Sequence, residues 1–347
     1  MATVLPSYTQ LQDVGKNPPQ IFQLCEIGFQ GLQQVIEGKR SFIDVYQETD
    51  PLATSIIASL ILSILTLLLS EATRNFSQVD RLWSILPAVY ICHYSYWANL
   101  NNLHSDRVNT AAVLSAVWSV RLTYNYWRKG GYEWSSEDYR WNHIKDTIGG
   151  PAFFLMNITF ISFIQNILLV AITTPAYLFL IMSKNFPKDE ATTATADTVF
   201  SRAMMLAIIL AFFSDQQQWS FHQAKHSYKA TGEAPAGWDK AELERGFIYS
   251  GLWAFSRHPN FVAEQLFWVL LYQWSAFVTD SVYNWAGVGA LSYLLLFQGS
   301  TWFTELITES KYKDYKIYQK HVSMFLPRIK SIQDGGFYFP ENESKEN

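Results

Sequence analysis

The sequence predicts an all-α fold, a polytopic bundle of about seven transmembrane helices. Of its 347 residues 49% are hydrophobic and only 16% are charged, whereas an ordinary soluble domain carries about 25% charged residues. The charges also stand far apart. The stretches between them have the roughly 20 residues that a helix needs to cross a bilayer core of about 30 Å.

The composition excludes several other classes of protein. With 26 basic against 30 acidic residues the formal charge is −4, which does not suit a nucleic-acid partner. Cys25 and Cys92 are the two cysteines. They are too few for a disulfide framework or a thiolate cage, and no metal site is expected. A disordered chain and a coiled coil are excluded as well.

The first fifty residues have a mixed composition with three prolines. They lack a basic segment followed by an apolar one, so no cleavable signal peptide is expected. Residues 21–36 carry apolar side chains at helical spacing, which predicts an amphipathic helix on the membrane surface. These side chains are Phe22, Cys25, Phe29, Leu32 and Ile36.

Most spans follow from the gaps between charges, although the third contains Arg121 and the fifth contains Asp215. They are expected in residues 51–70, 82–105, 108–127, 147–183, 200–219, 261–279 and 281–303. The fourth stretch has 37 residues and is either one kinked span or two short ones, with Pro175 as the break. The count is therefore seven or eight.

Basic residues predict the orientation, because Lys and Arg favour cytosolic loops. Six of them lie between residues 304 and 330, which places the C-terminal side in the cytosol. Two spans separate this region from the basic loop 221–260, which is therefore also cytosolic. Two more spans lead back to the basic loop 128–145, which is cytosolic as well if residues 147–183 cross the membrane once. This favours seven spans and a lumenal N-terminus.

The glycine fingerprint of dinucleotide-binding folds, the Walker A loop, H-E-x-x-H and G-x-S-x-G are all absent. Function must therefore be read from polar groups in or beside the spans. Arg121, Asn125 and Arg128 lie on one helical face. An arginine in hydrocarbon costs at least about 2.5–3.5 kcal/mol, so this face predicts an anion clamp. Arginines that reach to the head groups are the alternative.

The loop that follows, GGYEWSSEDYRW at residues 130–141, holds two glycines, four aromatic residues and four charges, among them Asp138. A solvated connector has no need of those aromatic residues. We expect a folded loop that lines a site, with a plain linker as the alternative.

Asp215 lies at the cytosolic end of the fifth span in the run FFSDQQQW. A buried carboxylate requires hydrogen-bond donors. Gln218 or Trp219 supplies them in one interpretation, and a ribose hydroxyl or nicotinamide amide of a ligand supplies them in the other.

The segment GLWAFSRHPNFVAE, residues 251–264, leads into the sixth span. Pro259 suits the first position of a helix, and Arg257 and His258 stand just before it. A helix N-terminus beside an arginine predicts a phosphate site, and Glu264 lies about one turn further on. Interfacial anchors and a structural ion pair are the alternative.

After the seventh span, Thr301, Thr304, Glu305 and Thr308 share a face. Lys311, Tyr315 and Tyr318 then occur at i, i+4 and i+7, which predicts a basic and aromatic stripe at the cytosolic surface. The stripe is either a simple interfacial helix or a site for adenine stacking and 2′-phosphate binding.

These segments resemble the steroid 5α-reductase C-terminal domain superfamily, which includes sterol C14 and Δ7 reductases and isoprenylcysteine carboxyl methyltransferases. The resemblance spans residues 213–327. It is carried by Asp215, the Gly251-Leu-Trp turn, Asn260-Phe261, Glu264, Trp268, Lys311, Tyr315, Tyr318 and Pro327. Residues 80–83 and 121–141 resemble a little-characterised membrane branch of that superfamily.

The resemblance implies a cofactor cavity that opens to the cytosol and holds NADPH. Arg121 and Arg257 would contact its phosphates. The other implied contacts are Asp215, Asn260, Glu264, Tyr315 and Tyr318, and His258, Asn125 and Lys311 complete the expected cofactor-binding set. The implied activity is that of an NADPH-dependent oxidoreductase acting on CH–CH groups, which reduces a carbon–carbon double bond of a sterol, steroid or other hydrophobic lipid.

The substrate end matches less well, because the first three spans lack the interior glutamate of the steroid 5α-reductases. Asp80, Tyr94 and Tyr124 are possible proton donors, but Tyr139 and Asp138 are preferred because their loop should cover the cavity. Alternative functions are an S-adenosylmethionine-dependent methyltransferase and a non-catalytic sterol-binding protein. Multi-pass membrane localisation is expected, and the endoplasmic reticulum is the superfamily's usual address.

Four regions are expected along the chain. They are an N-terminal segment with the interfacial helix (1–50), a substrate-side transmembrane part (51–200), a cofactor-side domain (201–330) and a polar tail (331–347). No feature of the sequence fixes the oligomeric state.

Overall fold

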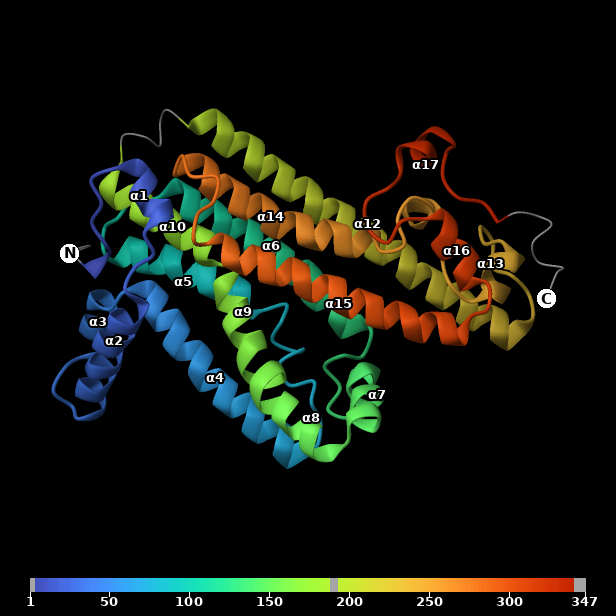
Figure 1. The fold of residues 1–347 in the computed structure, drawn as a ribbon, viewed down its shortest axis with the longest axis horizontal. Coiled ribbons are helices and arrows are strands. Elements are labelled where there is room, and N and C mark those ends of the chain that lie inside the picture. The colour runs from blue at the N-terminus through green and yellow to red at the C-terminus, as the bar shows by residue number, and fades with distance from the viewer. Residues whose placement is uncertain (1–3, 188–192, 340–347) are drawn as a thin grey trace. The chain divides into compact units, whose positions relative to one another are not determined.

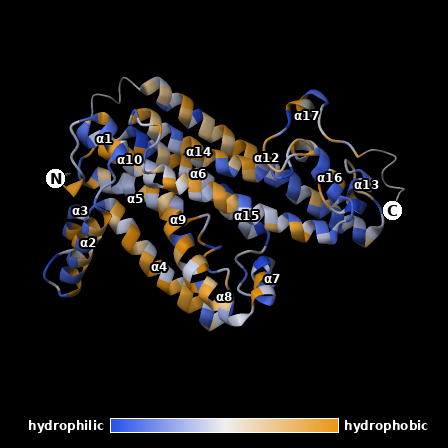
Figure 2. Ribbon diagram, in the orientation of Figure 1, coloured by the Kyte–Doolittle hydropathy of each residue, from blue (hydrophilic) through white to orange (hydrophobic). Residues whose placement is uncertain are grey.

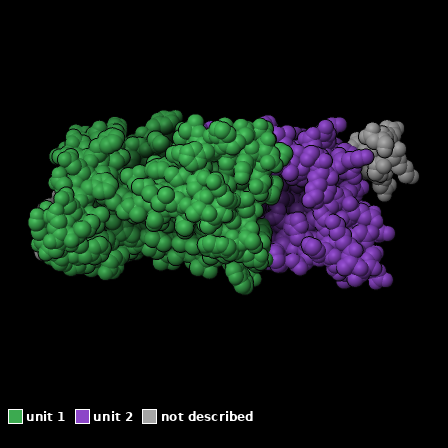
Figure 3. All heavy atoms as spheres, turned by 90° about the horizontal axis from the view of Figure 1, so that it is seen from below, with its two compact units in different colours: residues 1–205, 268–293 green, residues 206–267, 294–347 purple. Residues whose placement is uncertain are grey.

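The computed structural model describes residues 4–187 and 193–339, and these form helices with no strand (Figure 1). The all-α prediction is therefore confirmed for this part of the chain. The chain divides into two compact units (Figure 3). The first comprises the residues up to Met205 with Trp268–Tyr293, and the second comprises Leu206–Phe267 with the residues from Leu294 on.

Most helices belong wholly to the first unit. These are α1 (Leu11–Lys16), α2 (Ile21–Ile36), α3 (Phe42–Glu48), α4 (Pro51–Thr73), α5 (Leu86–Leu100), α6 (Asp106–Arg128), α7 (Tyr139–Ile148), α8 (Gly150–Met156), the π-helix η2 (Asn157–Ile164), α9 (Gln165–Ala171) and α10 (Thr174–Asn185). Three long helices have residues in both units: α12 (Ala194–Thr231), α14 (Pro259–Val278) and α15 (Gly287–Lys311). The second unit adds α13 (Lys240–Arg245), the 3₁₀ helix η3 (Gly251–Ala254), α16 (Tyr315–His321) and α17 (Ile329–Gln333).

Helix α10 forms the centre of the first unit. Residues 176–182 are at most 1% exposed, and the helix packs against α4, α5 and α6. Pro175 lies in its first turn, while α9 ends at Ala171. The break expected at Pro175 is therefore confirmed. Its cause is that proline lacks the N–H group that would continue a preceding helix.

Helix α4 has the side-chain distribution of a helix surrounded by lipid. Along its middle and C-terminal parts most hydroxyl-bearing residues are buried, whereas most large apolar residues are exposed. The buried set is Ser55, Ser59, Ser63, Thr66 and Ser70, and the exposed set includes Ile61, Ile64, Leu65, Leu68 and Leu69. Small residues allow helices to approach closely in a membrane, where leucine gains little from being buried. Figure 2 shows α4 coloured as predominantly hydrophobic beside α9, against which it packs.

Four helical segments are long and apolar enough to cross a membrane, namely Pro51–Thr73, the run Gly150–Asn185 that comprises α8 to α10, Ala194–Thr231 and Pro259–Val278. They correspond to the first, fourth, fifth and sixth expected spans. The other three expected spans form α5, α6 and α15. Helix α5 has 15 residues, or about 23 Å at 1.5 Å per residue, which is short for a bilayer. The total of seven spans stays a prediction.

The amphipathic helix expected in residues 21–36 is confirmed as α2. It packs against α4 through Gly28, where a Cβ atom would lie 2.7 Å from Ile57 Cδ1, and against α3 through Gly31, where one would lie 2.7 Å from Val45 Cγ1. Its apolar residues Phe22 and Ile36 are 94% and 78% exposed. Part of its apolar surface is thus used in packing, and part is exposed; its location on the membrane surface stays a prediction.

The core of the second unit is aromatic. Phe247, Tyr249, Tyr315, Tyr318 and Phe337 are buried in one cluster, and Phe221 and Trp253 belong to a neighbouring one. Because Phe337 is 9% exposed, the ordered unit extends beyond residue 330, into the region expected as a polar tail. Residues 340–347 of that tail lie outside the described part of the chain. The other expected boundary, residue 200, is close to Met205, but Trp268–Tyr293 return to the first unit.

Candidate functional site

Helix α14 begins at Pro259, as the sequence predicts. The turn before it is tied to the end of α16: the Arg257 N–H donates to the Ser323 carbonyl (3.0 Å), and the Ser256 hydroxyl donates to the Met324 carbonyl (3.3 Å). Arg257 and His258 are each 8% exposed. The two residues expected beside the helix N-terminus are therefore held in place by residues more than sixty positions away.

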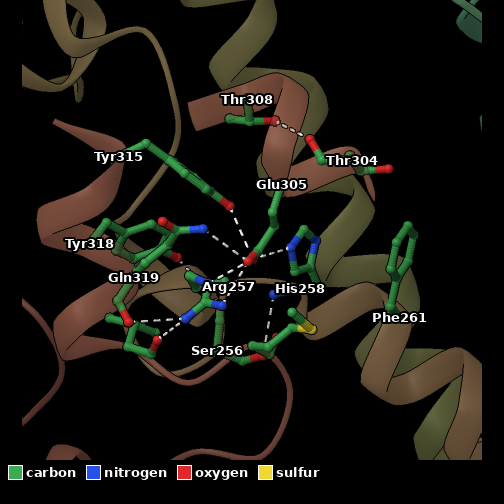
Figure 4. A network of polar contacts seen from close by, with 12 residues as sticks. Ser256, Arg257, His258, Phe261, Thr304, Glu305, Thr308, Tyr315, Tyr318 and Gln319 are labelled. Atoms are coloured by element: carbon green, nitrogen blue, oxygen red, sulfur yellow. Dashed lines mark hydrogen bonds and ion pairs between the residues drawn. The ribbon is translucent and has the colours of Figure 1, made fainter. Parts of the chain in front are cut away.

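The carboxylate of Glu305 is the centre of a buried hydrogen-bond network in the second unit (Figure 4). Arg257 donates to it at two points, with Nε–Oε1 2.6 Å and Nη2–Oε2 2.7 Å. His258 Nε2 lies 2.8 Å from Oε1. Tyr315 Oη and Gln319 Nε2 each donate over 3.2 Å. The carboxylate thus has five contacts from four side chains, which satisfies its acceptor capacity.

The electrostatics of this network favour a charged carboxylate. Burial by itself raises the pKa of Glu305, but the hydrogen bonds from His258 and Arg257 outweigh it and lower the pKa to about 2. Burial lowers the pKa of Arg257, but the hydrogen bond and the charge of Glu305 raise it above its usual value overall. Both members of the pair are therefore ionised at neutral pH.

The phosphate-binding role predicted for Arg257 receives no support from this geometry. Besides Glu305, its guanidinium donates through Nη1 to the Gln319 carbonyl (3.2 Å) and, in a short contact, to the Val322 carbonyl. Its remaining donors are thus directed to backbone groups at the end of α16. Arg257 acts here as an internal clamp between the start of α14 and the α15–α16 segment.

The prediction that Lys311, Tyr315 and Tyr318 form a stripe at the surface is wrong. Helix α15 ends at Lys311 and α16 begins at Tyr315, so the three residues do not share one continuous helical face. Tyr315 and Tyr318 are 5% and 1% exposed. Their rings pack on Phe247 at centroid distances of 5.1 and 5.6 Å. They are core residues, because aromatic rings gain more from packing than from exposure.

Asp215 and Asn260 are brought together by the fold. Both are buried, and Asn260 Nδ2 donates to Asp215 Oδ1 over 3.2 Å. Asn260 also accepts from the N–H of Phe261 (3.0 Å). Sequence reasoning considered donors close to Asp215 in the chain and missed this one, which is 45 residues away. Glu264 is likewise buried in the second unit.

A second cationic cluster, absent from the predicted set except for Lys311, surrounds the phenol of Tyr312. Lys225 Nζ donates to Tyr312 Oη (2.9 Å) and to the Gly246 carbonyl (2.6 Å). Lys311 Nζ lies 5.5 Å from the centre of the same ring. The hydrogen bond and charges of these lysines lower the pKa of the Tyr312 phenol although burial opposes that change. Among the described ion pairs neither lysine has a carboxylate partner.

The remaining predicted cofactor residues, Arg121 and Asn125, belong to the first unit and are buried in α6. The helical face is confirmed to the extent that Arg128 donates to Asn125 Oδ1 through Nε (3.0 Å) and Nη2 (2.8 Å). The Arg128 guanidinium also lies 5.4 Å from the centre of the Tyr124 ring.

The loop after α6 is folded, as predicted, and packs on residues 75–84. Arg81 Nη2 donates to the carbonyls of Glu133 (3.2 Å) and Ser136 (3.0 Å). Asn75 Nδ2 also donates to Ser136 (2.9 Å), and Trp141 Nε1 donates to Asp80 (2.9 Å). A single arginine and a single asparagine thus satisfy several loop carbonyls that would otherwise need water.

The predicted proton donors within this loop have other contacts. Asp138 is the N-cap of α7, accepting from the N–H of Arg140 (2.9 Å), and it pairs with that residue's guanidinium (Nη2–Oδ2 2.6 Å). Tyr139 is 53% exposed. Asp138 is therefore used as a helix cap and an ion-pair partner, and a catalytic role for either residue stays a prediction.

Glu305 is the main residue that sequence reasoning undervalued. The sequence puts it on a polar helical face just after the last predicted span and indicates no specific role for it. A signal was present, since residues 281–304 contain no other acidic or basic side chain. An isolated carboxylate at the end of such a stretch requires a cationic partner. The sequence did not show that the partner is Arg257.

An all-helical architecture with four membrane-length helices and a buried ionic network defines the chain as a helical membrane protein. The chain belongs to the family described as "Protein of unknown function (DUF1295)", which matches residues 66–322. It is 34% identical over 335 residues to "Uncharacterized protein C594.04c" of Schizosaccharomyces pombe. The aligned region covers 95% of this chain and 94% of that protein. No solved structure matches the chain.

Proposed function

We propose that the protein is an NADPH-dependent membrane reductase that acts on a carbon–carbon double bond of a sterol, steroid or other hydrophobic lipid. The resemblance of residues 213–327 to reductases of that kind supports the proposal. Within the structure, one observation carries it. Lys225 and Lys311 place two ammonium groups around Tyr312, and no described ion pair neutralises either of them.

Two groups of described residues fit the charged and polar parts of NADPH, and a third group does not. Lys225 and Lys311 suit a phosphate group, because ammonium groups bind phosphate as point charges. Asp215 and Asn260 offer a buried carboxylate and amide, which suit hydroxyl and carboxamide groups. Arg257, Tyr315 and Tyr318 do not fit, since they are used within the protein core.

Each group of residues then has a distinct role. Bound NADPH would supply a hydride. Lys225 and Lys311 would attract the phosphates and discriminate against NADH. Asp215 and Asn260 would orient a polar group of the nucleotide. Arg257 and Glu305 would act as positioning residues by fixing the start of α14, which carries Asn260.

Binding of NADPH, NADH and S-adenosylmethionine to the detergent-purified protein tests this proposal. We expect NADPH to bind more tightly than NADH, and Lys225→Met and Lys311→Ala each to reduce that preference about tenfold, the change that corresponds to about 1.4 kcal/mol. Lys313→Ala is the matched control, since Lys313 is an exposed neighbour outside the cluster. Stabilisation by S-adenosylmethionine alone would instead identify a methyltransferase, and binding of none of the three would favour a sterol-binding protein.

The substrate requires a separate measurement. Lipid profiles of cells with and without the protein are compared, and an unsaturated sterol or other lipid is expected to accumulate in its absence. An unchanged profile, together with absent NADPH oxidation by the purified protein in lipid extracts, would contradict the reductase proposal.

A further inference from the structure

A loop of the second unit, residues 325–336, contains α17 and is called the α17 loop below. Both of its ends are fixed to the turn that precedes α14. At one end the Ser256 hydroxyl donates to the Met324 carbonyl (3.3 Å). At the other end the Phe337 N–H donates to the Ala254 carbonyl (3.1 Å). The α17 loop therefore leaves from and returns to the same turn, in the manner of an Ω-loop.

This turn marks the level at which α14 would enter a bilayer. Helix α14 begins at Pro259 and is long and apolar enough to cross a membrane, so residues 254–257 would lie at the membrane edge. A second observation agrees with this level. Glu305 pairs with Arg257, and Trp302, one turn before Glu305 in α15, is 60% exposed. Tryptophan is enriched where helices cross the boundary between lipid and water.

Three aliphatic side chains of the α17 loop are uncovered. Leu326, Ile329 and Ile332 are 75%, 76% and 56% exposed. Ile329 and Ile332 share one face of α17, and Leu326 precedes them by the same spacing. Single exposed aliphatic residues are common, but a group of three so close together is typical of an interaction site. Figure 1 shows α17 at the tip of a loop that projects from α16.

The charges beside these side chains are mainly positive. The α17 loop contains two basic residues and one acidic residue, Asp334, and Lys320 and His321 end α16 just before it. Arg328 is exposed and donates to the Lys320 carbonyl (3.4 Å). Among the described ion pairs none includes Arg328 or Lys320. Aliphatic side chains among cations are typical of segments that lie on an anionic membrane surface.

We propose that the α17 loop docks on the surface of the bilayer beside α14, with anionic phospholipids as its partner. Leu326, Ile329 and Ile332 enter the outer part of the acyl-chain region. Arg328 and Lys320 pair with the phosphate groups of the lipids. The loop thereby holds the second unit against the membrane at the point where α14 begins. The proposal does not depend on the reductase function, because no residue of the loop belongs to the proposed NADPH site.

Other partners for the aliphatic side chains fit less well. The residues after Phe339 read PENESKEN and offer no aliphatic side chain. A second copy of the chain, docked about a two-fold axis, would bring the same patch of both copies together. Arg328 and Lys320 of one copy would then face those of the other, and like charges repel. An anionic bilayer surface suits both the aliphatic and the basic side chains, and the turn before α14 puts it within reach.

Fluorescence at the tip of the α17 loop tests the proposal. The full chain with Cys25→Ser, Cys92→Ser and Ile329→Cys is labelled with the environment-sensitive dye NBD and placed in nanodiscs of phosphatidylcholine and phosphatidylglycerol. We expect a blue-shifted emission that is quenched by lipids brominated in the upper acyl chain, more strongly when the brominated lipid is phosphatidylglycerol. Glu233→Cys in the same background is the matched control. Glu233 is exposed beyond the end of α12, and its dye should not be quenched.

Two further changes separate the aliphatic contribution from the basic one. Leu326→Ser with Ile332→Ser should remove the quenching at residue 329. Arg328→Gln should keep that quenching but reduce the difference between the two lipids. The replaced side chains are exposed, so the Tm should stay unchanged.

Three results would contradict the proposal. Quenching at residue 329 that is no stronger than at residue 233 would overturn it. A blue shift without quenching would overturn it as well, because it would report a partner made of protein. Equal quenching by the two brominated lipids, with Arg328 in place, would overturn the assignment of anionic phospholipid as the partner.

Discussion

Arg257 and Glu305 meet at two points deep in the second unit, with both nitrogen–oxygen distances below 2.8 Å. The residues stand 48 positions apart and join the start of α14 to the C-terminal part of α15. Removing two charges from water is costly unless their geometry is good. The additional contacts from His258, Tyr315 and Gln319 to the same carboxylate provide that geometry.

Replacing one partner of the Arg257–Glu305 pair should lower the free energy of unfolding much more than replacing both partners. Glu305→Leu leaves a buried guanidinium and is expected to cost about 3–5 kcal/mol of stability, whereas the double variant Arg257→Met with Glu305→Leu should recover part of that cost. Thermal unfolding of the natural protein, Arg257→Met, Glu305→Leu and the double variant in one detergent gives the coupling energy between the two sites. Additive effects of the two substitutions would show that the pair is not an energetic unit.

The same pair should give a stability that depends on acid pH. The pKa of Glu305 is about 2 in the folded protein, below the ordinary glutamate value of 4.5. A lowered pKa contributes stability that is complete above about pH 4.5 and is lost as the pH falls towards 2. The difference in Tm between the natural protein and Glu305→Gln should therefore narrow over that range. Glu309→Gln, at a partly exposed ion pair with Lys316, should give a small difference.

Asp80 should give the stability of the protein a pH dependence opposite to that given by Glu305. Burial and the charge of Asp138 raise the pKa of its carboxyl, so its contribution to stability is present below pH 3.8 and is lost as the pH rises through the folded value. Asp80→Asn keeps an acceptor for Trp141 Nε1. It should therefore become more stable relative to the natural protein as the pH rises. Asp138→Asn, which weakens the pair with Arg140, should be destabilising at neutral pH, and equal pH profiles for Asp80→Asn and the natural protein would contradict the prediction.

Two glycines of α15 should respond oppositely to alanine. A Cβ atom on Gly289 would lie 2.1 Å from the Ala171 carbonyl oxygen, whereas one on Gly299 would have no neighbour within 4 Å. We expect Gly289→Ala to destabilise by about 1–3 kcal/mol through overpacking, and Gly299→Ala to stabilise by up to about 1 kcal/mol through helix propensity. Thermal unfolding checks both, and the same sign for the two variants would be inconsistent with the packing described.

Local patterns in the sequence predicted those features that depend on neighbours in the chain. Pro259 begins α14 because proline suits a first helical position. Residues 21–36 form an amphipathic helix because their apolar side chains recur at helical spacing. The aromatic loop after α6 is folded because its rings and carbonyls find partners. In the first two cases the information lies within one helix, whereas the partners that hold the loop lie in residues 75–81.

The features that sequence reasoning missed depend on pairing across the chain. Tyr315 and Tyr318 have a spacing that suits a surface stripe, but Phe247 and Phe337 enclose them. Arg257 stands before a helix N-terminus, as a phosphate-binding arginine would, but its guanidinium is paired with Glu305. Spacing along a helix shows which residues share a face, and it does not show which distant element covers that face.

The low charge content and the apolar stretches by themselves determined a helical chain with membrane-length segments, because a bilayer tolerates few other arrangements of the backbone. The tertiary structure alone decided which charges are paired inside the protein and which have no carboxylate partner among the described ion pairs. It used Arg257 and Glu305 for the core of the second unit and left Lys225 and Lys311 around Tyr312. The physical reason is that a buried charge must be neutralised by a partner close in space, and closeness in space is set by the fold.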